Sequence, residues 1–481
     1  MSALRSAARV FLIALGFITF SLTLLFFVVS SPPEEVTQPP NTVNDVTQLN
    51  EIKVGKIYRP TTIEEISHLV AQHHGTISMG GARHSMGGQI AVENSMHLDM
   101  TYFNRIVSFS KDEKEITVQS GIRWREIQRH IDPFDLSVKI MQTYADFTVG
   151  GSLSVNVHGR YVGTGPLIHF VQSIKVVLPD GKLVNASRTE NQEIFRSCIG
   201  GYGGFGVIVE ATLQLTDNSK VERTAVLMPV SDYLSYFKRE IRENNDVVFH
   251  NADLYPEEYG TVRAVSYLKT EKPLTIQDRL ISTNKSYRAE RFAMWMVSEF
   301  PNGKWIRQHL GDPLAYASEK VCYRNYEAGY HAMELEPTSR SKSTYVLQEY
   351  FVPIDKINSF VPKMASIFQN YDANVINVSI RHAKPDTLSY LSWAKNEVFC
   401  FVIYYKQETS TEAKEKVRKW TRELIDAALS EGGSYYLPYQ LHATEGQFRE
   451  AYPRWEESFR VKKKIDPTFK FSNKFWEKYY R

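Results

Sequence analysis

Three glycine-rich runs in the first half of the chain limit its possible folds most strongly. They are MGGARHSMGG at 79–88, TVGGSLSVNVHGR at 148–160 and GYGGFG at 201–206. Because glycine has no Cβ, such runs let the backbone approach a ligand closely and expose several amide groups in one concavity. The first two runs therefore fit a pyrophosphate, although structural turns use the same residue types.

The third run matches the G-x-G-x-x-G pattern of dinucleotide-binding loops. That pattern needs a strand before it and a helix after it, because the helix N-terminus carries the phosphate. Here residues 191–198 (NQEIFRSC) look helical, whereas residues 207–215 (VIVEATLQL) alternate in the manner of a strand. The order is reversed, so we reject a nicotinamide Rossmann site at this run.

Composition places the chain among ordinary globular proteins. Of its 481 residues 43% are hydrophobic and 23% charged, and the formal net charge is +3. This length suggests two or three domains, and a charge so near neutrality gives no reason to expect nucleic acid. The three cysteines match no zinc pattern, and His73, His74 and His382 lack partners at metal-ligand spacing, so we predict no metal.

An apolar segment near the N-terminus predicts a membrane anchor. Residues 10–29 (VFLIALGFITFSLTLLFFVV) carry no charge, and about 20 such residues span a bilayer as a helix. Arg5 and Arg9 precede the segment, which predicts a cytoplasmic N-terminus at 1–9 and a body on the periplasmic or lumenal side. A cleaved signal peptide is the alternative, but its apolar region is usually shorter. The Pro-rich, polar residues 30–52 then form a linker.

The remaining chain is typical of an α+β protein rather than of a regular doubly wound sheet. Residues 61–73 carry the start signal and apolar spacing of a helix, and strand patterns recur at 116–119, 174–178, 345–352 and 398–405. From about residue 218 the aromatic content rises and the helical patterns lengthen. We therefore expect a first domain at 53–217, a second domain at 218–434 and a C-terminal segment at 435–481.

Four segments, in this order, resemble members of the vanillyl-alcohol oxidase superfamily. GARHS at 81–85 is similar to the G-x-R-H-S stretch of alditol and sugar-lactone oxidases, and residues 148–159 are similar to the T-V-G-G-x-L…H-G segment. VQSIKVVLPDGKLVNA at 171–186 followed by GGYGGFGVIVEATL resembles the end of the FAD-binding domain. AYPR at 451–454 with KKKIDPTFKFSNKFW resembles the C-terminal motif of decaprenylphosphoryl-ribose and lactone oxidases.

The resemblance implies a two-lobed FAD-binding domain of the PCMH type, a substrate (cap) domain, and a C-terminal segment that returns to the FAD-binding domain. It implies FAD as the cofactor, bound covalently through His84 to the 8α-methyl of the flavin. The residues that it places at the cofactor are Gly80, Gly81, Ala82, Arg83, His84, Ser85, Thr148, Gly150, Gly151, Ser152, Asn156, His158, Gly159, Gly206 and Val207.

The substrate domain carries fewer signals. QEYFVP at 348–353 resembles the family's central strand over the flavin, and NVSIR at 377–381 resembles a segment that reads S-E-I-R in alditol oxidases. The resemblance implies that Arg381 stabilises a substrate alkoxide or the reduced flavin, while Ser379 replaces the family's Glu. Tyr439 stands where relatives have Lys, and Tyr439 or His442 is then expected to act as a base or proton donor.

The leading hypothesis is an FAD-dependent oxidase or dehydrogenase that acts on an alcohol group of a sugar, polyol or sugar lactone. The first alternative is an enzyme that resembles decaprenylphosphoryl-ribose oxidase and acts on a lipid-linked sugar, which the basic residue of His158-Gly159-Arg160 favours. The second is a membrane-anchored flavin-binding protein without activity. Oxygen, a quinone or a protein remain open as electron acceptors.

Overall fold

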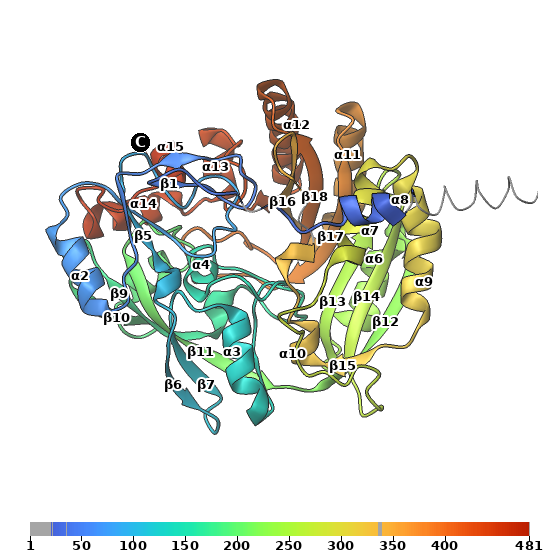
Figure 1. Ribbon diagram of the computed structural model, residues 1–481, viewed down its shortest axis with the longest axis horizontal. Coiled ribbons are helices and arrows are strands. Elements are labelled where there is room, and N and C mark those ends of the chain that lie inside the picture. The colour runs from blue at the N-terminus through green and yellow to red at the C-terminus, as the bar shows by residue number, and fades with distance from the viewer. Residues whose placement is uncertain (1–20, 22, 35, 335–338, 481) are drawn as a thin grey trace, which may run out of the picture.

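The computed structural model describes residues 21, 23–34, 36–334 and 339–480. Both domains mix helices with sheets, as the sequence predicts, and Figure 1 shows the first domain on the left and the second on the right. Residues 10–20 and 22 of the expected anchor lie outside the described residues, whereas residues 23–29 are helical. In the described part of the chain, no helix has both the length and the apolar character needed to cross a bilayer.

A small parallel sheet begins the first domain. Its order is β3-β5-β4, and the helix α2 connects β3 to β4. Thr62 caps α2 by accepting a hydrogen bond from the Glu65 amide, and Ile66 and Val70 are buried on one helix face. These elements and the preceding hairpin are β1 (Thr42–Val43), β2 (Ile52–Lys53), β3 (Lys56–Tyr58), α2 (Ile63–Gln72), β4 (Ile77–Gly80) and β5 (Met96–Asp99).

A six-stranded antiparallel sheet completes the first domain. Its order is β10-β9-β11-β7-β6, with β8 paired to β11. Its strands are β6 (Ile106–Ser110), β7 (Glu115–Gln119), β8 (Leu136–Val138), β9 (Val171–Val177), β10 (Leu183–Ser187) and β11 (Val207–Asp217). Its helices are η1 (Met100–Tyr102), α3 (Trp124–Ile131), η2 (Asp132–Phe134), α4 (Val149–Ser154), η3 (Leu167–Phe170) and α5 (Gln192–Cys198). The third glycine-rich run lies between α5 and β11, so the helix-before-strand order is as the sequence predicts.

An eight-stranded antiparallel sheet forms the second domain, in the order β15-β12-β14-β13-β17-β18-β16-β19. Its strands are β12 (Lys220–Pro229), β13 (Val247–Leu254), β14 (Thr261–Lys269), β15 (Val321–Tyr323), β16 (Ser343–Pro353), β17 (Val375–Ala383), β18 (Val398–Glu408) and β19 (Ser434–Tyr435). Its helices are α6 (Val230–Tyr236), η4 (Phe237–Ile241), α7 (Arg288–Glu299), α8 (Gly303–Ile306), η5 (Arg307–Gly311), α9 (Asp312–Ala317), α10 (Arg324–Glu327), η6 (Ala332–Glu334), η7 (Ile354–Lys356), α11 (Ile357–Asn370) and α12 (Thr411–Ser430).

The two faces of β16 have different partners because side chains alternate along a strand. Gln348 points toward α12, where its amide donates to the Thr421 hydroxyl at 2.7 Å. Leu347 and Glu349 point the other way and line a pocket against the first domain. This face of the sheet is therefore the wall that the second domain contributes to the pocket.

The C-terminal segment packs on the first domain (Figure 1). Its helices are α13 (Glu445–Ala451), α14 (Trp455–Ile465) and α15 (Lys474–Tyr479). The fully buried Lys462 ammonium pairs with Asp466 at 2.6 Å and donates to the Gly204 and Phe471 carbonyls. A buried charge of this kind is stable only when it is fully hydrogen-bonded, so these contacts connect the segment firmly to the third glycine-rich run.

Candidate active site

One extended pocket lies between the first domain and one face of the second domain's sheet. Its lining includes all three glycine-rich runs and the β16–β18–β17 face of the sheet. Of the residues predicted at the cofactor, the pocket is lined by Gly80, Gly81, Ala82, Arg83, His84, Ser85, Thr148, Gly150, Gly151, His158, Gly206 and Val207. Ser152, Asn156 and Gly159 do not line it.

The first glycine-rich run follows β4 and presents a row of free amides. Among the described residues, none accepts a hydrogen bond from the backbone amides of residues 81–85, which all line the pocket. The run is fixed at its C-terminal end, because the Met86 amide donates to the Pro438 carbonyl at 2.7 Å. Buried or half-buried amides rarely remain without an acceptor. Consecutive free amides of this kind are suited to a phosphate or pyrophosphate group.

Gly81 is required by close packing of the first run on the second. A Cβ added to Gly81 would lie 2.1 Å from the Thr148 hydroxyl oxygen. Thr148 is the N-cap of α4 and accepts from the Gly151 amide at 3.3 Å. The two runs thus share one contact, and any side chain at Gly81 would push them apart.

The second run differs from the expectation that its amides bind the pyrophosphate. The amides of Val149 and Gly150 donate to the Ile122 and Ser120 carbonyls, and that of Gly151 donates to Thr148. Its residues therefore contribute close packing and side chains rather than free amides.

Two hydroxyl groups supplement the free amides. Ser120 and Thr143 line the pocket, and their buried hydroxyl oxygens have no hydrogen-bond partner among the described residues. Buried hydroxyl groups normally have a partner. Together with the amides of the first run, these groups fit a polar cofactor with a pyrophosphate, and FAD has that chemistry.

His84 lies in the pocket lining beside Phe147, with the two ring centroids 4.1 Å apart. Burial lowers the pKa of His84 to about 4, although the nearby Asp146 carboxylate opposes the shift. Asp146 is itself paired with His331 at 2.8 Å and with Arg125. The imidazole of His84 is therefore neutral near pH 7, which leaves one ring nitrogen with a free lone pair.

Glu349 is the functional candidate that the sequence prediction missed. Its side chain is 3% exposed, and Oε1 lies 2.5 Å from His158 Nε2. Its Oε2 accepts a hydrogen bond from the Tyr439 hydroxyl at 3.4 Å. The signal was present in QEYFVP, where Glu349 is the one charged residue of the strand pattern. Burying a carboxylate costs free energy, so a lone carboxylate in such a strand indicates a function.

Arg381 lies on the same face of the sheet as Glu349. On β18, Val402 pairs with Glu349 of β16, and Cys400 pairs with Arg381 of β17. Cys400 and Val402 are two residues apart and share one face, so Glu349 and Arg381 lie on that same face. Arg381 lines the pocket, and its Nε has no hydrogen-bond partner among the described residues. The sheet thus offers a carboxylate and a guanidinium to one small region.

Tyr439 and His442 have different positions relative to the pocket, although only two residues lie between them. Tyr439 lines the pocket, and burial, followed by the Glu349 charge, raises its pKa well above the usual range. The phenol is therefore protonated near neutral pH and donates a hydrogen bond to Glu349. His442 does not line the pocket, and burial lowers its pKa to about 3.

His158, Glu349 and Cys400 are the one group of three side chains, within the described ranges, whose ligand atoms lie close enough to hold a metal ion. Those atoms all lie within 4.8 Å of one another. Two of the three candidate ligands, His158 and Glu349, are hydrogen-bonded to each other. Burial raises the pKa of the Cys400 thiol, which keeps the thiol protonated. A protonated thiol is a poor metal ligand, so the absence of a metal stays our prediction.

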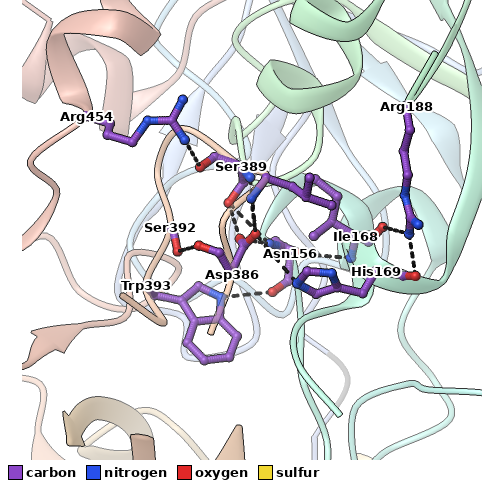
Figure 2. Close-up of polar contacts among 10 residues, drawn as sticks. Asn156, Ile168, His169, Arg188, Asp386, Ser389, Ser392, Trp393 and Arg454 are labelled. Carbon is purple, nitrogen blue, oxygen red and sulfur yellow. Dashed lines mark hydrogen bonds and ion pairs between the residues drawn. The ribbon is translucent and has the colours of Figure 1, made fainter. Parts of the chain in front are cut away.

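Asn156 belongs to a hub between the domains rather than to the pocket (Figure 2). The side-chain amide of Asn156 donates to Asp386 Oδ2 at 3.0 Å, and the backbone carbonyl of Asn156 accepts from the Trp393 indole at 3.0 Å. Asp386 also accepts from Ser389, whose carbonyl accepts from Arg454 of the C-terminal segment at 3.3 Å. The hub therefore joins both domains and the C-terminal segment.

The hub reaches the pocket through Trp393. The Trp393 ring stacks on Phe351 with centroids 4.2 Å apart and lies 4.9 Å from the His158 ring. Gly159 is needed next to His158, because a Cβ there would lie 2.2 Å from the Met141 carbonyl oxygen. These contacts fix the orientation of the His158 ring toward Glu349.

Comparison with known proteins agrees with this geometry. An FAD binding domain family matches residues 56–187, and the D-arabinono-1,4-lactone oxidase family matches residues 211–479, more than half of the chain. L-gulonolactone oxidase from Bos taurus is 20% identical over 88% of this chain and 94% of its own length. Mitochondrial L-galactono-1,4-lactone dehydrogenase from Arabidopsis thaliana is 27% identical over 39% of this chain and 31% of its own length. The chain therefore belongs to the D-arabinono-1,4-lactone oxidase family and is an FAD-dependent oxidoreductase that acts on CH–OH groups.

Proposed function

We propose that the protein oxidises a hydroxyl-bearing carbon of a sugar lactone. The bound FAD supplies a hydride acceptor, so the carbon loses its hydrogen with two electrons and the hydroxyl group loses a proton. The observation that carries the proposal is the His158–Glu349 pair, buried and hydrogen-bonded on the pocket wall.

The His158–Glu349 pair is the proton acceptor in this proposal. A carboxylate that bonds an imidazole can receive the substrate hydroxyl proton either directly or through the ring. Tyr439 donates to the other carboxylate oxygen and holds Glu349 in place. Arg381 contributes a fixed positive charge near the oxygen that becomes negative as the proton leaves.

The proposal is tested by the anaerobic reduction of bound flavin with a panel of sugar lactones, in wild type and in Glu349→Gln. Gln preserves the shape and one hydrogen bond but accepts no proton. We expect the rate of flavin reduction to fall by about 10²–10⁴-fold, with unchanged flavin content. Tyr439→Phe is the matched control on the same carboxylate and should lower the rate by about tenfold, since it removes only one hydrogen bond.

Each alternative has its own outcome in this experiment. Reduction by a prenyl-phosphoryl pentose and by no lactone would replace the substrate class with a lipid-linked sugar. Bound flavin that neither substrate reduces would support a flavin-binding protein without activity. Equal rates in wild type and Glu349→Gln would remove Glu349 from the proton transfer.

The covalent attachment of FAD at His84 is a further part of the proposal. Its support is the neutral imidazole of His84, which lies in the pocket lining within the run of free amides at residues 81–85. A neutral ring nitrogen is the nucleophile that such a bond requires.

The electron acceptor and the membrane side remain separate expectations. The names of the relatives include both an oxidase and a dehydrogenase, so an oxygen electrode run beside a quinone-analogue assay separates the two acceptors.

We propose the single-pass anchor at residues 10–29 with the body on the periplasmic or lumenal side. A reporter fused to the C-terminus tests that orientation.

A further inference from the structure

An apolar surface covers the outer face of α8, η5 and α9, which we call the α8–α9 surface. Trp305 is 55% exposed, Leu310 54% and Leu314 77%. Leu310 and Leu314 are one helical turn apart, so they share one face. Exposed apolar side chains that share one face mark interaction surfaces more often than single ones do.

The charged residues of the same segment face inward, the reverse of the usual arrangement in water. Arg307 and Asp312 each have side chains 17% exposed, and they pair at 3.4 Å. The Tyr255 hydroxyl donates to Asp312 at 2.6 Å, and Arg307 donates to the Ile376 carbonyl at 3.1 Å. No residue from 305 to 318 presents an exposed charged side chain. Soluble surfaces expose charge and bury leucine, so this face is suited to an apolar environment.

The end of the apolar N-terminal segment is attached beside this surface. The Phe26 ring lies 5.2 Å from that of Phe292 on α7, and the Arg291 guanidinium donates to the Ser30 carbonyl at 3.1 Å. Phe27 lies under the Arg288 guanidinium of α7, 5.4 Å from it, and Leu24, Phe27 and Val28 are each more than half exposed.

The same helix α7 leads directly into α8. A Cβ at Gly303, the first residue of α8, would lie 1.8 Å from the Met296 carbonyl oxygen of α7, so the two helices are in close contact. The N-terminal helix and the α8–α9 surface therefore lie on the same side of the molecule, far from α2 (Figure 1).

We propose that the α8–α9 surface lies in the interface of the lipid bilayer that residues 10–29 enter. The occupant follows from the described end of the apolar segment, where Phe26 and Ser30 contact α7 next to this surface. The inference rests on the membrane anchor proposed above, which would bring lipid to this side of the body. Amphipathic helices of this kind bury their apolar face about 5–10 Å into the boundary between headgroups and acyl chains. Trp305 is of the residue type that favours this boundary.

This contact sets the orientation of the body. The second domain rests on the bilayer, and the first domain with α2 points away from it. The inference goes beyond the catalytic proposal and does not depend on it, because no residue of the α8–α9 surface lines the pocket.

The experiment uses the full chain with one introduced cysteine that carries an environment-sensitive fluorophore. The three native cysteines are buried, so Leu314→Cys is labelled selectively. The protein is reconstituted into vesicles of phosphatidylcholine and phosphatidylglycerol, and flotation confirms that it is bound. We expect the emission at position 314 to increase at least about twofold with a blue shift on entering lipid. The matched control is Glu64→Cys on α2, whose emission should stay unchanged.

Three outcomes overturn the proposal. Unchanged emission at position 314 in chains that float with the vesicles would show that the surface remains in water. Blue-shifted emission before vesicles are added would show that protein covers the surface, either the chain's own N-terminal residues or a second copy. Failure of the full chain to float with the vesicles would show that the protein does not bind a bilayer. Flavin reduction, measured in the same samples, reports separately on the catalytic proposal.

A second measurement uses the native tryptophan. Lipids with brominated acyl chains quench tryptophan fluorescence at short range, and the difference between wild type and Trp305→Phe isolates the signal of Trp305. We expect quenching in wild type to exceed that in the variant. Equal quenching would contradict contact between Trp305 and lipid.

Discussion

At the scale of single residues, burial decides the protonation states around the pocket. Burial lowers the pKa of His84 to about 4, which leaves a neutral imidazole, and raises that of Tyr439, which leaves a protonated phenol that donates a hydrogen bond. Glu349, in contact with His158 and Tyr439, is the acceptor of the set. These three side chains of one pocket lining therefore differ in what they offer to a ligand, as the proposed function requires.

The residue-scale prediction concerns His84→Ala. We expect wild-type protein precipitated with acid and run on a denaturing gel to retain flavin fluorescence on its band, and the variant to lose it. The variant should still bind flavin in its native state, because the free amides of residues 81–85 are unchanged. Wild-type protein that releases all its flavin on denaturation would contradict the covalent bond and favour the lipid-linked-sugar alternative.

At the scale of elements, the pocket depends on two glycine-rich runs in direct contact. The first run presents its amides because the loop around Tyr439 holds it from outside, with the Gln89 amide donating to the Leu437 and Tyr439 carbonyls at 2.7 and 2.8 Å. The second run caps α4 through Thr148 and leaves room for the first at Gly81.

The element-scale prediction concerns Gly81→Ala. The new Cβ collides with the Thr148 hydroxyl oxygen, which disturbs the cap of α4 and displaces the free amides. We expect the fraction of chains that carry flavin to fall severalfold and stability to fall by about 1–3 kcal/mol, measured by absorbance and thermal unfolding. Gly260→Ala is the control, since a Cβ at Gly260 meets nothing within 4 Å. Equal flavin content in both variants would show that the contact between the runs is not needed.

At the scale of the whole molecule, two domains and a C-terminal segment enclose one pocket. Buried histidines are found in all three parts. Burial lowers the pKa of His84 to about 4 and those of His97, His250 and His442 to about 3. His250 is fixed between Tyr233 and Ser266 at 2.9 and 2.8 Å. Protonation of any of them would place a charge where burial disfavours it.

The molecular-scale prediction is therefore a loss of stability in mild acid. Unfolded chains take up these protons near the ordinary histidine pKa of about 6.5, whereas the native protein takes them up only near 4 or below. At these four histidines the unfolded state binds more protons in this range. Burial raises the pKa of Asp45 to about 6 and that of Glu334 to about 7, which acts in the opposite direction, but the four histidines outweigh these two carboxyl groups, so stability falls as the pH falls from about 6.5 toward 4. We expect the loss to be on the order of a few kcal/mol. Thermal unfolding between pH 7.5 and 4.5 measures it, and a constant midpoint would contradict the prediction.

An exposed histidine provides the control for this slope. His68 on α2 is exposed, so His68→Gln should leave the dependence on pH unchanged. His97→Asn should reduce the dependence even though it lowers stability at neutral pH, because it removes one proton uptake site from the unfolded chain.

The sequence alone determined the local structure and the family. Helix spacing and a capping threonine predicted α2, and alternation predicted β11 after the third run, because both patterns act within a few residues. The four motifs in order predicted the FAD-binding fold, and the comparisons confirm the family. The expected anchor stays a prediction.

Only the tertiary structure decided which side chains meet. The register of β16 with β18 placed Glu349 in the pocket, and the packing between domains moved Asn156 into the hub and left His442 outside the pocket lining. The same folding engaged the amides of α4 and left those of residues 81–85 free. Strand register and burial arise from contacts between residues far apart in the chain, and no local pattern carries that information.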